Sequence, residues 1–498
     1  MEIRLLQNRA IRWYIIFIIC IGNILGACTE KNILVDEYIE ATPKIFPDYT
    51  DVMLPANISP INFKINEIGD EYVVSFGTGG RVIFRLDSYD GIIRIPEDKW
   101  KNYLQNVTDN EFFIRIFIRR GNKWFAYNDI KNFVSKDSID SYLVYRLLYP
   151  GYELWNEMGI YQRNLSSFDE IPVLKNTSFD KQCINCHTFN KNSSEVMMFH
   201  IRGKKGGTII RKNNAIKKVD MKPKNSSIGG AYSSLHPNGN FIAFSMNEIQ
   251  QFFHRSGKKP IEVVDLESDL GVYDIEDDEM ISHNSICDSM YMETFPCWSA
   301  DGKEIFFCRA KSYMLGQPLD SIYYDLCKIP FNSETKTFGS VEEIFKASEI
   351  NKSVSFPRIS PDGNFLLFTL SNYGNFSIWH PESDLYLLDL RSGNINELSN
   401  INSNDVESYH SWSSSGKWIV FSSKRINGQW AHPYFSHFNH DTGEFSKPFL
   451  LPQKDPLFYD NFSMTFNIPE LITEPILNDK SLIEAINSDK INHIILRK

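Results

Sequence analysis

The chain has 498 residues, 42% of them hydrophobic and 14% aromatic, so it is long enough for two to four domains with sizeable cores. Its 52 basic and 62 acidic residues give a net charge of −10 without any basic block, which argues against nucleic acid as a partner. The 36 Phe and 23 Tyr favour β structure, because aromatic side chains pack well on a pleated sheet.

Residues 1–27 have the features of an export signal. Several arginines precede an apolar core at Trp13–Leu25, which is too short to cross a membrane as a stable helix. The core ends in Leu25-Gly26-Ala27-Cys28, which resembles a bacterial lipoprotein signal. The resemblance implies cleavage before Cys28 and a lipid on its sulfur, so we expect an envelope protein tethered to the membrane and facing the periplasm or the cell surface. An ordinary signal peptide that contains a cysteine is the alternative.

The first folded part is predicted to be a β-sandwich-like domain at residues 51–150, after a polar tether at 28–50. Several short runs alternate apolar and polar residues, most clearly Glu111–Arg120, and one short helix is expected near Asp98–Asn106. No catalytic constellation stands out here. Residues 151–179 are expected to be a connector that packs over the site described below.

A repeat dominates the region 180–470. Four segments align without gaps around a glycine turn: Tyr232–Phe244, Phe295–Phe307, Phe356–Phe368 and Tyr409–Phe421. Each has an aromatic residue seven positions before the glycine and a Phe five positions after it. Glycine adopts a positive φ without steric cost, so each segment is predicted to be a tight β-hairpin.

These segments resemble the "SPDG" repeats of the TolB-like, WD-like β-propellers. The resemblance implies an all-β chain in which the sandwich-like domain is followed by a propeller. Cys183–Phe189 and Val196–Arg202 look like a degenerate further hairpin, and Tyr459–Ile468 like a first strand that closes the ring. We expect five blades, with six as the alternative, and a tail at 471–498 with a helix at Lys480–Ile486.

Cys183-Ile184-Asn185-Cys186-His187 is a C-x-x-C-H motif, the pattern that attaches a c-type haem. Cys183 and Cys186 would form thioether bonds to one covalent haem c, and His187 would be the proximal iron ligand. A disulfide or redox dithiol and a zinc half-site are the alternatives; zinc would require two further ligands. The combination of lipoprotein signal, β domain, single C-x-x-C-H and propeller also resembles exported Bacteroidetes-type proteins described as TolB-like or cytochrome-c-related.

The second iron ligand is expected on the neighbouring strand. Strand alternation places Met198 and His200 on one face and Met197 on the other, and His200 is the better candidate. Four cysteines beyond the motif are expected to be buried free thiols, although a disulfide is open to them: Cys287, Cys297, Cys308 and Cys327.

Three hypotheses about function follow. The first is a lipid-anchored monohaem protein whose propeller positions the haem for electron transfer or sensing with a protein partner. The second is an envelope propeller that serves as a binding module, with Cys183 and Cys186 purely structural. The third and weakest is a haem enzyme acting on a small substrate at the propeller mouth; a multi-haem peroxidase would require a second attachment motif, and the chain has one. Hydrolase chemistry is not expected, because the chain has no G-x-S-x-G motif.

Overall fold

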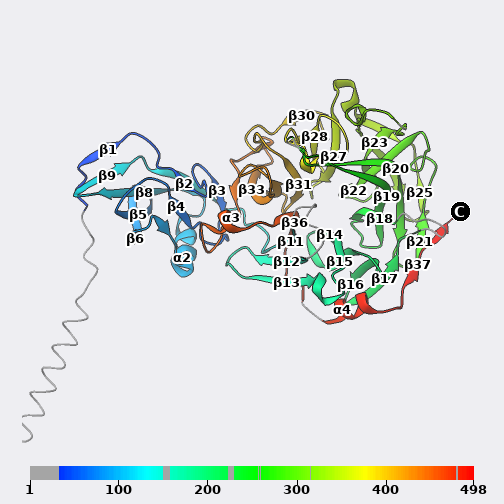
Figure 1. Ribbon diagram of the computed structural model, residues 1–498, viewed down its shortest axis with the longest axis horizontal. Coiled ribbons are helices and arrows are strands. Elements are labelled where there is room, and N and C mark those ends of the chain that lie inside the picture. Colours follow the sequence, from blue (N-terminus) through cyan, green and yellow to red (C-terminus); the bar gives the residue numbers. More distant parts are fainter. Residues whose placement is uncertain are drawn as a thin grey trace, which may run out of the picture.

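The computed structural model describes residues 33–149, 157–222, 229–255, 257, 259–314, 316–477 and 480–497. The signal segment and Cys28 lie outside these ranges. Within them, no helix combines the length and the apolar character that crossing a membrane would require. The chain folds into a small β domain beside a large β-propeller, as Figure 1 shows.

The small domain consists of two sheets and one helix. The larger sheet has seven strands: β1 (Glu37–Ile39), β3 (Met53–Pro55), β5 (Glu71–Thr78), β6 (Arg81–Ser88), β8 (Asn110–Arg120), β9 (Lys123–Tyr127) and β10 (Ile130–Ser135). The smaller sheet has three: β2 (Ile45–Phe46), β4 (Phe63–Ile65) and β7 (Ile92–Ile93). Helix α2 (Glu97–Val107) buries Trp100 and Tyr103 in the core, at the place where the sequence predicts a helix. Because β1 and β2 pair within these sheets, the domain begins inside the segment expected to be a tether.

Six sheets form the propeller. Blade 1 comprises β36 (Thr465–Ile472), β11 (Tyr142–Leu148), β12 (Met158–Asn164) and β13 (Glu170–Lys175). Blade 2 comprises β14 (Cys183–Asn190), β15 (Ser193–Arg202), β16 (Gly207–Lys212), β17 (Ala215–Asp220) and β37 (Asn492–His493). Blade 3 comprises β18 (Gly230–Leu235), β19 (Phe241–Phe253), β20 (Ile261–Asp274), β21 (Glu279–Ile281) and β38 (Ile495–Arg497).

The other three blades contain the remaining strands. Blade 4 comprises β22 (Tyr291–Trp298), β23 (Glu304–Lys311), β24 (Asp325–Asn332), β25 (Thr337–Phe338) and β26 (Glu342–Phe345). Blade 5 comprises β27 (Ser353–Ile359), β28 (Phe365–Ser371), β29 (Asp384–Asp389) and β30 (Ile395–Glu397). Blade 6 comprises β31 (Glu407–Trp412), β32 (Trp418–Ser423), β33 (His432–Asn439), β34 (Glu444–Phe445) and β35 (Phe449–Leu450). Two short helices follow, α3 (Phe458–Asn461) and α4 (Lys480–Asn487).

The ring is closed by a strand from the end of the chain. The inner strands β36, β14, β18, β22, β27 and β31 contact one another in that order, and β31 returns to β36. β36 pairs antiparallel with β11, so the prediction of a late closing strand is confirmed. The expected five blades are wrong, and the alternative of six is right. Blade 1 has no glycine turn of the repeat, and its strands come from two distant segments, so no local pattern identifies it.

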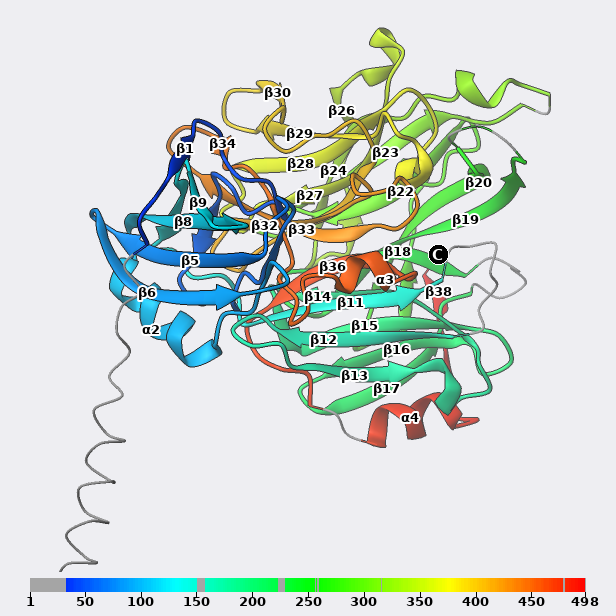
Figure 2. The same cartoon turned by 60° about the vertical axis from the view of Figure 1, so that its left-hand side comes forward.

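The segments expected to be a connector and a tail contribute strands to the propeller. β12 and β13 both lie in the segment expected to be a connector, and β11 belongs to the propeller instead of the small domain. In the tail, β37 and β38 pair parallel with β17 and β21 and add a fifth strand to blades 2 and 3. Figure 2 shows the tail, in red, along the outer edge of these blades. The predicted helix in the tail is confirmed as α4.

The inner strands share one irregularity that shapes the propeller axis. Each breaks its register with its partner over two residues, and in five strands the first of the two has a left-handed φ of 39–55°. We call these five the axial ring: Tyr232, Phe295, Phe356, Tyr409 and Ile468. The four aromatic rings lie 4.4, 4.5 and 4.8 Å from one another in sequence order, between ring centroids. In β14 the same register shift falls between Asn185 and Thr188, which gives the Cys186 backbone the sixth place.

The small domain is joined to blade 6 by specific polar contacts and by a shared apolar core. The indole of Trp418 donates a 2.9 Å hydrogen bond to the Asp137 carbonyl. The Asp140 carboxylate accepts hydrogen bonds of 2.8 and 2.5 Å from the backbone N–H and the hydroxyl of Ser414. One continuous cluster of buried apolar residues extends from the small domain into blades 1, 5 and 6.

Candidate functional site

The C-x-x-C-H motif lies at the start of β14, the inner strand of blade 2. Cys183 is buried and stands opposite Arg202 in the β14–β15 register. His187 is also buried, 4% exposed, beside the propeller axis. The side chain of Cys186 is outside what the structure describes. The motif is thus extended backbone with a register shift at residues 186–187. In a regular strand Cys183 and Cys186 would face opposite sides and His187 the side of Cys183, and the shift interrupts this alternation at His187.

His187 borders a narrow pocket on the axis. This axial pocket has a volume of about 40 Å³ and is lined by the axial ring, the residues after it in each strand, and His187, Arg358 and Glu470. The Nε2 atom of His187 is buried without a hydrogen-bond partner. Burial, with the nearby charge of Arg146, lowers the pKa of His187 to about 3. The imidazole is therefore neutral at physiological pH.

Cys183 borders a different and larger space, which we call the covered cavity. Its volume is about 220 Å³, and it lies on the other side of the axial-ring members Tyr232, Tyr409 and Ile468, which line both spaces. Its wall is mostly apolar, and the apolar side chains come from blades 1, 3 and 5: Leu148, Met158, Ile249, Phe253, Ile261, Val263, Phe376, Ile378 and Trp379. Ligand sites in proteins have this character, an apolar wall with a few converging polar groups.

Two arginines supply the charge of the covered cavity. The Arg146 side chain is 9% exposed and donates 2.8, 2.6 and 2.8 Å hydrogen bonds to the Ile184 carbonyl and to the side-chain oxygens of Asn185 and Asn467. All three acceptors are neutral, and the Arg146 Nε is buried without a partner. Within the described ranges, neither Arg146 nor Arg202 forms an ion pair. A buried cation without a counterion is costly, so an anionic occupant would be favoured here.

A long hairpin covers this cavity. The outer halves of β19 and β20 extend beyond blade 3 and place Ile249, Phe253, Ile261 and Val263 over it. Blade 5 holds the hairpin through charged contacts near its tip. Lys259 Nζ lies 2.5 Å from a Glu382 carboxylate oxygen.

A second contact from blade 5 holds the same hairpin at Glu262. This carboxylate accepts a short hydrogen bond from the Tyr373 hydroxyl, lies 3.5 Å from His380 Nε2 and 3.2 Å from His254 Nε2. Hydrogen bonding to His380 and Tyr373 lowers the pKa of Glu262 to about 2. The cover is therefore clamped by a carboxylate that stays ionised over a wide pH range.

The expected second iron ligands lie elsewhere. Met198 and His200 share a face of β15 and Met197 lies on the other, as alternation predicts. Met198 is 1% exposed and packs in the core between blades 2 and 3. His200 Nδ1 lies 3.0 Å from the Thr208 hydroxyl, and burial lowers the pKa of His200 to about 4. It lines a separate groove with Arg202 and Lys222.

These placements do not fit a c-type haem. Such a haem requires the thioether sulfurs and the iron-binding histidine at one cavity, but Cys183 lines the covered cavity and His187 the axial pocket. Neither Met198 nor His200 lines the axial pocket. In the described part of the chain, no group of three His, Cys, Asp or Glu side chains is arranged to hold a metal ion. Haem attachment therefore stays a prediction that the geometry does not support.

Other sequence expectations have mixed outcomes. Cys297, Cys308 and Cys327 are buried free thiols, as expected, and Cys287 is a half-buried one. Sequence reasoning missed Arg146. The only local signal was an arginine in an otherwise apolar strand, Tyr142–Leu148, and its role depends on β14 and β36 from elsewhere in the chain.

Comparisons with known proteins give no family. No protein-family model matches the chain, and no curated protein matches it. Among solved structures, it is similar to a puromycin-hydrolysing peptidase of Mycobacterium tuberculosis, with 10% identity, a TM-score of 0.32 and coverage of 84% of this chain and 57% of that one. It is also similar to a prolyl endopeptidase structure, with 10% identity, a TM-score of 0.35 and coverage of 81% and 49%. A third is dipeptidyl peptidase 4 of Porphyromonas gingivalis, with 10% identity, a TM-score of 0.28 and coverage of 59% and 48%. The chain thus spans about half the length of these structures, and at such TM-scores the likeness carries no argument about activity.

Proposed function

We propose that this chain is an exported, lipid-anchored β-propeller that binds an organic anion with an apolar body in the covered cavity. The observation that carries the proposal is the buried guanidinium of Arg146, which has only neutral acceptors at the wall of an apolar cavity. A ligand carboxylate would supply the missing charge, and Arg202 at the rim would supply a second cation. The lipid anchor rests on the sequence around Cys28.

The binding test uses palmitate and haemin, two carboxylates with different apolar bodies, on the complete mature protein. We expect isothermal titration to show binding of at least one of them, with hexadecanol, which lacks the carboxylate, at least tenfold weaker than palmitate. A charged hydrogen bond contributes about 1.5–3 kcal/mol, or roughly 10- to 150-fold in affinity. Arg202→Gln and Arg146→Gln should weaken binding by about tenfold or more.

The variants differ in their risk to the fold. Arg202 is exposed, so Arg202→Gln should leave the melting temperature unchanged. Arg391→Gln is the matched control, because Arg391 is exposed on blade 5 and pairs with its neighbour Asp389. The proposal is wrong if neither carboxylate binds, or if Arg202→Gln binds as tightly as Arg391→Gln. The anchor is tested separately: labelling with radioactive palmitate in the native host should be lost in Cys28→Ser.

A second candidate is the monohaem protein predicted from the sequence, serving electron transfer or sensing with a protein partner. One observation favours it: Cys183 lines the same apolar cavity as Arg146 and Arg202, whose guanidinium groups could pair with the two propionates of a haem. Expression in a host that matures c-type cytochromes separates the two candidates. An added haem mass that is lost in Cys183→Ala/Cys186→Ala supports covalent haem. An unmodified mass with reversible haemin or palmitate binding supports the binding protein.

A further inference from the structure

Another cavity lies at the end of the propeller axis opposite the covered cavity, on the face that carries the glycine turns. This turn-side cavity has a volume of about 420 Å³. Each inner strand contributes the residue two positions after its axial-ring place: Thr188, Ser234, Cys297, Arg358, Ser411 and Glu470. The next residue of each strand adds an apolar rim: Phe189, Leu235, Trp298, Ile359, Trp412 and Leu471. The repeat therefore builds a regular wall that is neutral at four positions and charged at two.

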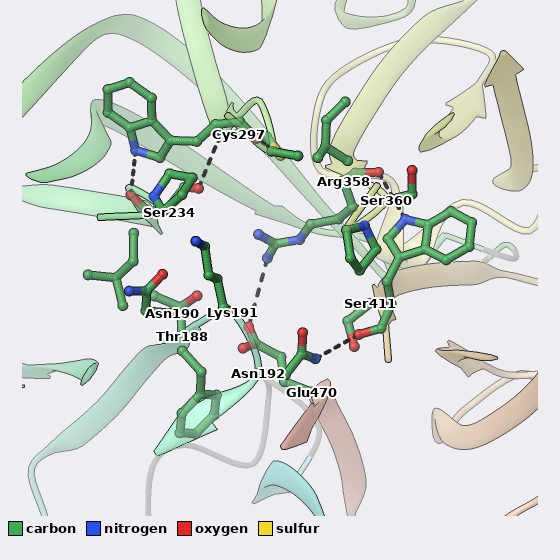
Figure 3. A pocket seen from close by; sticks show the side chains of 18 of the residues that line it. Thr188, Asn190, Lys191, Asn192, Ser234, Cys297, Arg358, Ser360, Ser411 and Glu470 are labelled. Carbon is green, nitrogen blue, oxygen red and sulfur yellow. Dashed lines mark hydrogen bonds and ion pairs between the residues drawn. The ribbon is translucent and has the colours of Figure 1, made fainter. Parts of the chain in front are cut away.

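The two charged wall residues are adjacent but not hydrogen bonded. Arg358 Nη2 lies 3.9 Å from Glu470 Oε1, as the dashed line in Figure 3 marks. Glu470 Oε1 is buried and has no hydrogen-bond partner. The Arg358 side chain donates no hydrogen bond within the described ranges, although its carbonyl accepts a 3.2 Å bond from the Trp412 indole. Both groups thus keep unused hydrogen-bonding capacity toward the cavity.

A third charge comes from the β14–β15 turn. Figure 3 shows the Lys191 ammonium directed into the same space as the Arg358 guanidinium. Lys191 and Asn192 both have positive φ, 49° and 59°, and form a two-residue turn shorter than the glycine turns of the other blades. The Asn192 side chain fixes this turn by donating 2.8 Å hydrogen bonds to the carbonyls of Trp412 and Leu471. The cavity therefore presents two cations beside one carboxylate.

We propose that the turn-side cavity binds a free α-amino acid. Its carboxylate would accept hydrogen bonds from Arg358 and Lys191, and its ammonium would donate to Glu470. The cationic and anionic side chains lie next to each other on the cavity wall, as the carboxylate and the ammonium do on an α-amino acid. Burial raises the pKa of Glu470 to about 7, and a bound cation would favour its ionised form. This site is separate from the covered cavity, so either proposal can fail alone.

The test begins with a mixture of the twenty L-amino acids at millimolar concentration and the complete mature protein. We expect a higher melting temperature, because a ligand that binds only the folded state stabilises it. Isothermal titration then identifies the amino acid. Its N-acetyl derivative, which lacks the ammonium, and the corresponding amine, which lacks the carboxylate, should each bind at least tenfold more weakly.

Substitutions test which residues bind the carboxylate of the amino acid and which bind its ammonium group. Arg358→Gln should weaken the amino acid at least tenfold and leave the corresponding amine unaffected. Glu470→Gln should remove the preference for the free amino acid over its N-acetyl derivative. Lys191→Gln is an exposed turn substitution that should weaken binding without changing the melting temperature, and Arg391→Gln is the control. If no amino acid in the mixture raises the melting temperature, or if Lys191→Gln and Arg358→Gln both bind it like the control, the proposal is overturned.

Discussion

Because the backbone of the axial ring is left-handed, we expect a glycine variant there to be more stable than the alanine variant, the reverse of the usual order in a strand. Tyr232 has a φ of 49°, a conformation that costs a residue with a Cβ about 1–2 kcal/mol and costs glycine almost nothing. In a regular strand, by contrast, glycine is about 0.5–1 kcal/mol worse than alanine. We therefore expect Tyr232→Gly to be more stable than Tyr232→Ala, although both lose the ring contact with Phe295.

Tyr386 provides the matched control. It is also half-buried, lies in the regular strand β29, and stacks on Phe368 at 5.9 Å between ring centroids. At this position alanine should be more stable than glycine by about 0.5–1 kcal/mol. At each position, the difference in free energy of unfolding between the glycine and alanine variants excludes the lost side-chain contacts, because both variants lose them. The difference at Tyr232 should exceed that at Tyr386 by about 1–2 kcal/mol, which is the cost of the left-handed backbone at Tyr232.

The measurement is urea unfolding of the four variants, with tryptophan fluorescence as the signal and the free energy of unfolding taken from midpoint and slope. An alanine advantage of equal size at both positions would refute the reasoning. It would mean that the backbone at Tyr232 relaxes to an ordinary strand conformation once the aromatic ring is removed.

Three other predictions concern a glycine turn between two blades, the carboxylate that holds the long hairpin, and the C-terminal strands. Gly302→Ala should destabilise the chain more than Gly393→Ala, because both glycines have a φ of 75° but a Cβ on Gly302 would lie 2.3 Å from His236 of the neighbouring blade, whereas Gly393 has open space; equal losses would contradict this contact. Glu262→Gln should lower the melting temperature at pH 7, and the difference from the unsubstituted protein should vanish as the pH falls from about 4.5 toward 2, because the pKa of Glu262 is lower in the folded state and its stabilisation needs the carboxylate; a difference that persists at pH 2 would exclude that cause. Truncation after Asn487 should increase aggregation, measured by light scattering, because it removes β37 and β38 and exposes the edges of β17 and β21; an unchanged monomer would show that these edges need no cover.

Local sequence was sufficient for the repeated hairpins. Gly239, Gly302, Gly363 and Gly416 all have a φ of 68–75°, as tight turns require, and each joins an inner strand to the next strand of its blade. The degenerate hairpin at β14–β15 was also identified, because Val196–Arg202 resembles the second strand of the repeat, with Phe199 at the place of its Phe. Turn chemistry and strand alternation act over a few residues, so a single sequence displays them.

The tertiary structure decided the blade count and the meaning of C-x-x-C-H. Blade 1 combines β36 with β11, more than 300 residues apart, and no short-range pattern reports such a pairing. The motif was interpreted by its residue types alone, yet β14, with its register shift at residues 186–187, places Cys183 and His187 at different cavities. Arg146 and Arg358 are ordinary strand residues in the sequence. Their importance depends on which charges surround them, and only the closed ring determines that.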